Sequence, residues 1–195
     1  MAETIFPLQS VTKVIGLERV DSTQALAAEL ALKGEPEGTL VLACEQTEAF
    51  GRDGQPFYSA EGGVYFTLLL RPNKSEDAFP SLGAKMAGVI AHTLTAIFEI
   101  KTKATNEGDV LAWDKNAHKW KKIAGVLVQA LHTDTEDWAL LGVGIHLNNP
   151  LPASRKKTEV SLKQLIRTET SKELFLDELL ENFWKEYSYW TRSAR

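Results

Sequence analysis

Cysteine is nearly absent from the 195-residue chain, in which Cys44 is the single example. One cysteine cannot form an internal disulfide, so the disulfide-rich secreted scaffolds are excluded. Cys44 lies in an apolar stretch, which favours a buried, unreactive thiol over a nucleophile. The four histidines show neither metal-ligand spacing nor an HExxH pair, and we therefore expect no metal site. A P-loop and a GxSxG turn are also missing.

An excess of basic residues is missing too. Lys and Arg total 22 against 26 Asp and Glu, which gives a formal net charge of −4. General nucleic-acid binders usually carry a basic stripe, so we expect no nucleic-acid partner. No apolar run reaches the roughly 18 residues of a membrane helix, and residues 1–10 lack the pattern of a signal peptide. We expect a cytoplasmic protein without a membrane contact.

The composition that remains is that of an average soluble domain, with 44% hydrophobic and 25% charged residues. Apolar patterning predicts strands at residues 13–19, 39–45, 64–71, 99–104, 110–113, 121–131 and 138–146, and helices at 24–33, 81–97 and 172–190. Asp21, Ser22 and Thr23 are good N-caps for the first helix. The strand spacing is too irregular for a doubly wound parallel sheet, so we predict an α+β sheet fold.

Three segments carry residues suited to chemistry. In residues 45–55 (EQTEAFGRDGQ), glycines would let backbone N–H groups approach a ligand and Arg52 could pair with a phosphate or carboxylate, although the same residues also suit an ordinary turn. In residues 121–128 (KKIAGVLV), Lys122 begins an apolar strand, where it could face a bound anion or only solvent. In residues 142–148 (GVGIHLN), two glycines inside an apolar strand indicate close approach by a ligand or another backbone.

Together and in this order, these segments resemble the catalytic domain of the biotin–protein ligases, which share a superfamily with lipoate ligases and octanoyltransferases. Residues 21–24 (DSTQ) resemble the family's Asp-Ser-Thr-Asn helix start. Residues 43–59 (ACEQTEAFGRDGQPFYS) resemble its ligand loop, Gln-Thr-x-Gly-Arg-Gly-Arg-x-Gly-Arg-x-Trp-x-Ser, and residues 61–66 (EGGVYF) continue the match. Residues 121–128 resemble Lys-Lys-x-x-Gly-x-Leu-x-Glu, and residues 142–148 resemble Gly-x-Gly-Ile-Asn-x-Asn.

The resemblance implies a class II synthetase-like fold, with a mixed or antiparallel sheet packed by helices. It implies an enzyme that activates biotin with ATP and Mg to biotinyl-adenylate and transfers it to a lysine of a biotin carboxyl carrier domain, with no tightly bound cofactor. It runs from about residue 14 to about residue 187. We therefore expect one catalytic domain over residues 1–195, without the N-terminal helix-turn-helix or C-terminal SH3-like domains of some members. A homodimer is compatible, since related ligases can pair by edge strands.

The resemblance also assigns roles by position. Ser22, Thr23 and Gln46 would contact the ureido ring of biotin, while Gly125 and Gly142 would let the ligand lie against backbone. Arg52 would hold the biotin carboxylate and the adenylate phosphate, and Lys122 would neutralise charge at the reacting groups, which makes these two the expected catalytic residues. The expected nucleotide-binding residues are Arg52, Asn106, Lys122 and His146.

Several positions depart from the family pattern. Phe50 and Gln55 replace loop arginines, Phe57 replaces a tryptophan and His146 replaces an asparagine. Lost arginines leave less positive charge to offset a triphosphate, and the biotin side is better preserved than the nucleotide side. Two alternatives therefore stay beside the ligase hypothesis: a non-catalytic module that binds biotin, an acyl group or a protein, and a lipoate or octanoate transferase.

Overall fold

A mixed sheet forms the centre of the computed structural model, which describes residues 10–132 and 137–192. Its seven strands are β1 (Lys13–Val20), β2 (Thr39–Gln46), β3 (Val64–Leu70), β4 (Thr102–Ala104), β5 (Asp109–Asp114), β6 (Lys119–His132) and β7 (Asp137–Ile145). They lie in the order β1-β2-β3-β7-β6-β5-β4. The β1–β2 pair is parallel and all other neighbouring pairs are antiparallel, which confirms the predicted α+β class.

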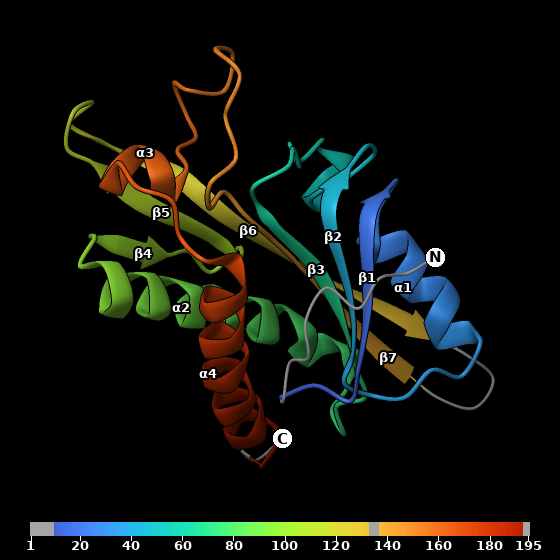
Figure 1. The fold of residues 1–195 in the computed structure, drawn as a ribbon. Helices are drawn as coiled ribbons and strands as arrows, with labels where there is room; N and C mark the ends of the chain where they lie inside the picture. Colours follow the sequence, from blue (N-terminus) through green and yellow to red (C-terminus); the bar gives the residue numbers. More distant parts are fainter. Residues whose placement is uncertain (1–9, 133–136, 193–195) are drawn as a thin grey trace.

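Helices cover the two faces of the sheet unequally (Figure 1). The long helices α2 (Phe79–Phe98) and α4 (Lys172–Arg192) pack on one face, and α1 (Thr23–Leu32) packs on the other. A short helix, α3 (Leu162–Ile166), and two 3-10 turns, η1 (Arg52–Gly54) and η2 (Glu76–Ala78), complete the described elements. The sequence analysis missed α3, although Ser161 and Gln164 form its capping box.

Alternate side chains along β3 point to opposite faces of the sheet and pack in different clusters. Phe66 and Leu68 are fully buried in the large core under α2 and α4, whereas Leu69 belongs to a smaller cluster under α1. Thr67, also fully buried, points to the α1 side. Since α1 covers only part of its face, the rest of that face, over β3, β7 and β6, is left for a cavity.

Two predicted boundaries shift for physical reasons. Helix α2 ends where Glu99 adopts a left-handed conformation, with φ of 53°, and β4 begins only at Thr102. The β5–β6 hairpin is longer than predicted, so that residues 115–118 alone connect its arms. Cys44, expected to be buried, is half-buried near the end of β2.

One expectation about membranes needs correction. The helical segment Glu76–Phe98 is long and apolar enough, by length and composition alone, to cross a membrane. In this fold one side of the helix, including Leu82, Met86 and Ile90, is fully buried against the sheet, whereas Ile97 is exposed. The apolar character of this segment is accounted for by the core.

Candidate functional site

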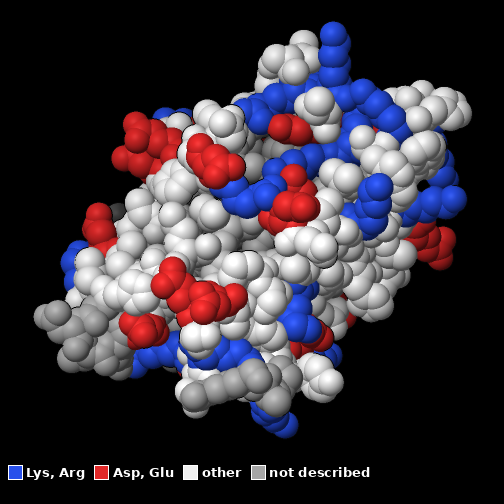
Figure 2. Space-filling model, turned by 180° about the vertical axis from the view of Figure 1, so that it is seen from behind, with Lys and Arg blue, Asp and Glu red and all other residues white. Residues whose placement is uncertain are grey.

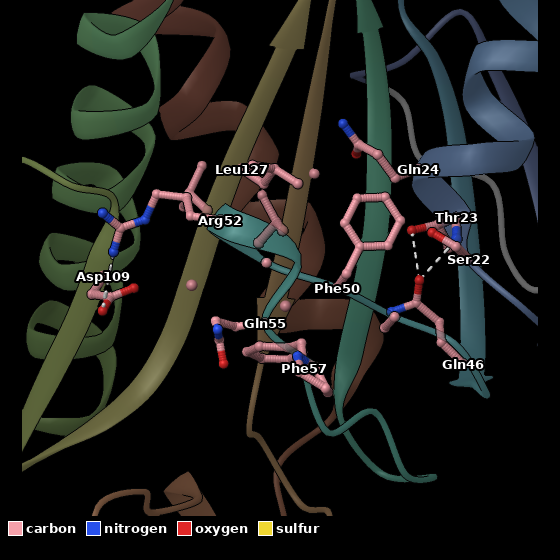
Figure 3. A pocket seen from close by; sticks show the side chains of 18 of the residues that line it. Ser22, Thr23, Gln24, Gln46, Phe50, Arg52, Gln55, Phe57, Asp109 and Leu127 are labelled. Atoms are coloured by element: carbon pink, nitrogen blue, oxygen red, sulfur yellow. Dashed lines mark hydrogen bonds and ion pairs between the residues drawn. The ribbon is translucent and has the colours of Figure 1, made fainter.

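A cavity of about 530 Å³ occupies the uncovered part of the α1 face. Its walls come from the start of α1, the end of β2, the loop between β2 and β3, and the strands β3, β5, β6 and β7 (Figure 3). It brings together the candidates Ser22, Thr23, Gln46, Arg52, Lys122, Gly125 and Gly142. Seven of the nine site residues expected from the sequence thus line one cavity.

Uncharged hydrogen-bonding groups form the end of the cavity at α1. The Ser22 hydroxyl caps the helix by accepting from the N–H of Ala25 at 3.4 Å. Thr23 donates through its N–H and its hydroxyl to Gln46 Oε1, at 2.8 and 3.0 Å, and Gln46 Nε2 donates to the Ser59 hydroxyl at 3.1 Å. The Gln46 amide is therefore fixed in one orientation, with the helix start beside it.

Thr67 and Gln24 extend this network and were missed by the sequence analysis. The Thr67 hydroxyl lies 3.0 Å from both Thr23 Oγ1 and Gln24 Oε1, and Gln24 Nε2 donates to the Leu140 carbonyl at 3.0 Å. Both side chains are buried. Thr67 could have been found as the one polar residue within the apolar strand run VYFTLLL, because a buried hydroxyl needs a partner.

Glycines form the floor of the cavity. A Cβ on Gly142 would collide with Gln24 Oε1, and a Cβ on Gly144 would collide with the ring of Phe57. A Cβ on Gly125 would lie 3.1 Å from Lys122 Cε. The two strand glycines noted in the sequence therefore admit neighbouring side chains close to the backbone, as glycine within a strand often does.

Two cations share one carboxylate on the β5–β6 side of the cavity. Lys122 Nζ lies 2.7 Å from Asp109 Oδ1, and Arg52 Nη2 lies 3.6 Å from Asp109 Oδ2. All three side chains are partly exposed, and all line the cavity. Asp109 thus holds both expected catalytic residues near one point while cancelling only one of their charges.

The loop between β2 and β3 folds back over the cavity. The N–H of Gly51 donates to the Gln55 carbonyl at 2.7 Å, and Asp53 between them is left-handed, with φ of 55°. Phe50 points into the cavity from this loop (Figure 3). The loop position at which the family pattern has an arginine is therefore filled by an apolar ring.

His146 lies behind the cavity wall rather than on it. Its side chain is fully buried and stacks on Phe57, with ring centroids 5.1 Å apart and planes 3° apart. Asn149 Nδ2 lies within hydrogen-bond distance of His146 Nδ1, at 3.0 Å. Nε2 lies 3.3 Å from Glu159 Oε2, so His146 can act on a ligand only through its neighbours.

Glu159 connects His146 to the cavity. Burial would raise the pKa of its carboxyl, but His146 and Arg155 lower the pKa overall by hydrogen bonding and charge. Arg155 Nη1 donates to Glu159 Oε1 at 2.6 Å, and both residues line the cavity. The sequence analysis did not assign either residue to the site, because a local arginine–glutamate pair carries no sign of the cavity and the contact of Arg155 with Pro56 joins distant parts of the chain.

Asn106 lines a neighbouring cavity of about 560 Å³, which shares Arg52, Val126 and Leu127 with the first. Of the expected nucleotide-binding residues, Arg52 and Lys122 therefore line the first cavity, whereas Asn106 lies next to it and His146 behind it. Within residues 10–132 and 137–192, no group of three or more His, Cys, Asp or Glu side chains could hold a metal ion.

Basic side chains gather on part of the surface despite the net charge of −4. Figure 2, seen from the side opposite to Figure 1, shows Lys and Arg concentrated over the region of the β5–β6 hairpin and the segment that follows β7. This region adjoins the cation side of the cavity, since Lys122 and Arg155 line it from these two segments. The local charge thus favours anions where the global charge does not.

Comparison with known proteins extends the geometric findings. The family model described as "Biotin/lipoate A/B protein ligase family" matches residues 16–146. The bifunctional ligase/repressor BirA of Bacillus subtilis is 31% identical over 173 residues, and that of Bacillus spizizenii is 30% identical. These matches cover 86% of this chain but 51% of each relative, so the chain spans about half the length of these curated relatives.

Solved structures show the same architecture. The biotin protein ligase from Aquifex aeolicus in complex with biotin and ATP superposes with a TM-score of 0.80 at 27% identity, over 94% of this chain and 73% of that one. The ligase from Leishmania major in complex with biotinyl-5-AMP gives a TM-score of 0.72 at 18% identity, over 93% of this chain and 77% of that one, a likeness of fold alone. The predicted sheet architecture is confirmed.

Proposed function

Because the chain belongs to the biotin/lipoate A/B protein ligase family, we propose that it activates biotin with ATP and transfers the biotinyl group to a lysine of a carrier protein. One observation carries this proposal. A single cavity holds an uncharged hydrogen-bonding network on one side and two cations, Arg52 and Lys122, on the other. Biotin has the same division, with a neutral urea at one end and a carboxylate at the other.

The uncharged side suits the urea. A urea offers two N–H donors and a carbonyl acceptor, and it is recognised best by fixed neutral partners. Ser22, Thr23 and Gln46 supply hydroxyl, backbone N–H and amide groups that are already oriented by the helix start. Gly142 and Gly144 let the side chains of Gln24 and Phe57 lie directly against the strands, and a fused ring would rest on these two side chains.

The cationic side suits the chemistry. In the first step, an oxygen of the biotin carboxylate attacks the α-phosphorus of ATP, and pyrophosphate leaves with the bonding electrons. In the second, the amine of the acceptor lysine attacks the acyl carbonyl, loses a proton, and AMP leaves. Arg52 and Lys122 would stabilise the negative charge that builds up on the phosphoryl oxygens during both steps. Mg would arrive with ATP, held mainly by the phosphate oxygens.

Mass spectrometry tests the proposal. A biotin carboxyl carrier domain incubated with the protein, biotin, ATP and Mg should gain the mass of biotin minus one water. The substitution Lys122→Ala should abolish this gain and leave the fold intact, because Lys122 is partly exposed and its loss opens no core cavity. No gain with the unsubstituted protein, while a control ligase works, would refute the proposal, and full activity of Lys122→Ala would refute the mechanism.

One observation supports a second candidate, a binding module without catalysis. Each of the cavity's three cations, Arg52, Lys122 and Arg155, is paired with a carboxylate, and Phe50 projects where the family has an arginine. Calorimetry separates the two: a ligase binds biotin and ATP, whereas the module binds biotin without responding to nucleotide. Lipoate and octanoate in the same assays distinguish an acyl transferase from both.

A further inference from the structure

Arg155 occupies a place in the cavity that neither the family motifs nor the two expected catalytic residues account for. We propose that it is a phosphate-binding residue for the nucleotide, acting beside Lys122. This assignment rests on the proposed function and deepens it, since it names a third cation for the charged part of the substrate.

The Arg155 guanidinium is held at the cavity wall by two hydrogen bonds. Nη1 donates to Glu159 Oε1 at 2.6 Å, and Nη2 donates to the Pro56 carbonyl at 3.2 Å. The second bond connects the segment after β7 to the loop between β2 and β3. The guanidinium is therefore fixed against the loop that carries Arg52, which lowers the entropy lost when it binds an anion.

The backbone places Arg155 on the same side as Lys122. The N–H of Lys122 donates to the Thr158 carbonyl, and the N–H of Val160 donates to the Lys122 carbonyl, each at 2.9 Å. These bonds run the segment after β7 alongside the start of β6. Lys122 and Arg155 thus reach one cavity from two adjoining stretches of chain, as two cations must to contact neighbouring phosphate oxygens.

Glu159 lies between the buried His146 and Arg155, so its position helps to orient the Arg155 guanidinium. Its side chain is 14% exposed, and its second oxygen faces Nε2 of the fully buried His146 at 3.3 Å. The side chains of an exposed arginine–glutamate pair sample many rotamers, whereas the largely buried Glu159, packed against the ring of His146, has fewer available to it. His146 was expected to contact the nucleotide. It would instead position Arg155 indirectly, through Glu159.

The guanidinium keeps donors for a ligand. An arginine side chain has five N–H donors, and two of them are used on residues within the described part of the chain. The remaining donors form a fork suited to phosphate oxygens. Arg52, Lys122 and Arg155 also balance three lining carboxylates, Asp53, Asp109 and Glu159. Loss of Arg155 would leave the cavity with an excess of negative charge.

Binding measurements on the full chain test this role. Arg155→Ala should weaken the binding of ATP with Mg by about tenfold to a hundredfold, since a charge-assisted bond to phosphate is lost. The affinities for adenosine and for biotin should not change, as neither molecule has a phosphate. Arg155→Lys keeps the charge but loses the forked donor geometry, so its affinity for ATP should lie between those of Arg155→Ala and the unsubstituted protein. Lys156→Ala removes the same charge from an exposed neighbour outside the cavity and should leave all affinities unchanged.

The outcomes are distinct. An equal loss of adenosine and ATP binding in Arg155→Ala would mean that the residue only supports the loop, and would overturn the assignment. Unchanged KM for ATP in an active Arg155→Ala protein would overturn it while the ligase function stands. ATP binding that depends on Arg155 without any adenylate formation would support the assignment while the proposed function fails. A protein with no affinity for ATP would refute both.

Discussion

Asp109 shows how one side chain can set the properties of a site without being part of the expected chemistry. It lies within ion-pair distance of both Lys122 and Arg52, so it holds two cations close together against their mutual repulsion. A ligand carboxylate or phosphate arriving between these cations competes with Asp109 for them. The affinity for an anionic ligand therefore depends on how much more strongly Lys122 and Arg52 bind the ligand than they bind Asp109.

At Gly142 the missing side chain is the functional feature. The substitution Gly142→Ala should push Gln24 away from its bonds to Leu140 and Thr67, because the new methyl group would occupy the position of Gln24 Oε1. Displaced buried polar groups cost about 1–3 kcal/mol of folding free energy. We also expect biotin affinity to fall by about tenfold, because Gln24 and Thr67 belong to the network that orients Thr23, and a bond of about 1.4 kcal/mol to the ligand would be lost. Calorimetry with biotin measures this.

Gly88→Ala provides the matched control for that substitution. Gly88 lies within α2, and a Cβ there would meet nothing within 4 Å. Alanine is the better helix former by about 1 kcal/mol, so this change should leave biotin affinity unaltered and make unfolding slightly harder. Equal biotin affinity in Gly142→Ala and in Gly88→Ala would show that the position of Gln24 over Gly142 does not matter for ligand binding.

Among the elements, the β5–β6 hairpin has an ion pair built into it. Asp114 Oδ2 lies 2.8 Å from Lys121 Nζ, while Asp114 Oδ1 accepts from the N–H groups of Asn116 and Ala117. The rings of Trp113 and Trp120 meet edge to face beside it. This hairpin carries Lys122 and Asp109 at its base, so its stiffness bears on the site.

The ion pair makes the stability of the hairpin depend on pH. Burial would raise the pKa of Asp114, but the hydrogen bonds from Lys121, Ala117 and Asn116 lower the pKa overall. A carboxyl with a lowered pKa stabilises the fold above its ordinary value near 3.9 and loses that contribution as the pH falls through the folded value. Asp114→Asn keeps an oxygen for the two N–H groups but lacks the charge, and should lower the free energy of unfolding by about 1–3 kcal/mol at pH 7.

Denaturant unfolding of both proteins from pH 7 to pH 2 checks this, and the difference between them should shrink at low pH. Glu18→Gln is the matched control, because Glu18 is an exposed carboxylate on β1, and it should cost little at any pH. A difference between Asp114→Asn and the unsubstituted protein that stays constant with pH would rule out the charge as its origin.

What the sequence could predict at this scale follows from the range of each interaction. The apolar spacing in β3 and α2 is local, and the predicted strands and helices were recovered with shifts of a few residues at their ends. Strand order and the contacts of Thr67 with Gln24, or of Arg155 with Pro56, join residues far apart in the chain, and no local pattern encodes them. The resemblance placed Arg52 and Lys122 in one site, but could not foresee that Asp109 connects them.

For the whole molecule, ligand binding and folding should be coupled. The cavity is lined from α1, β2, β3, β5, β6 and β7, so a bound ligand contacts most of the sheet. Biotin at about a hundred times its Kd would add about 2.7 kcal/mol, which for a chain of this size corresponds to a rise in Tm of about 5–10 °C. In a thermal melt we expect a single unfolding transition whose Tm rises with biotin concentration.

Octanoate and lipoate are the comparison ligands for that measurement. A rise in Tm with either of them and none with biotin would assign the cavity to a different acyl group. A melt that is insensitive to all three would contradict the ligand-binding role of the cavity altogether.

The two-sided sheet also determines how this protein can change over evolution or in the laboratory. Along β3, β6 and β7, neighbouring residues alternate between the core under α2 and α4 and the cavity on the other face. Thr67, Leu127, Phe50 and Phe57 line the cavity and lie outside the core under α2 and α4. Thr67 is held in a buried hydrogen-bond network and Phe57 stacks on His146, so Leu127 and Phe50 are the two that can change with least effect on folding. A library restricted to Leu127 and Phe50 would therefore vary the shape of the cavity at little risk to stability, whereas a library of core positions would mainly change stability.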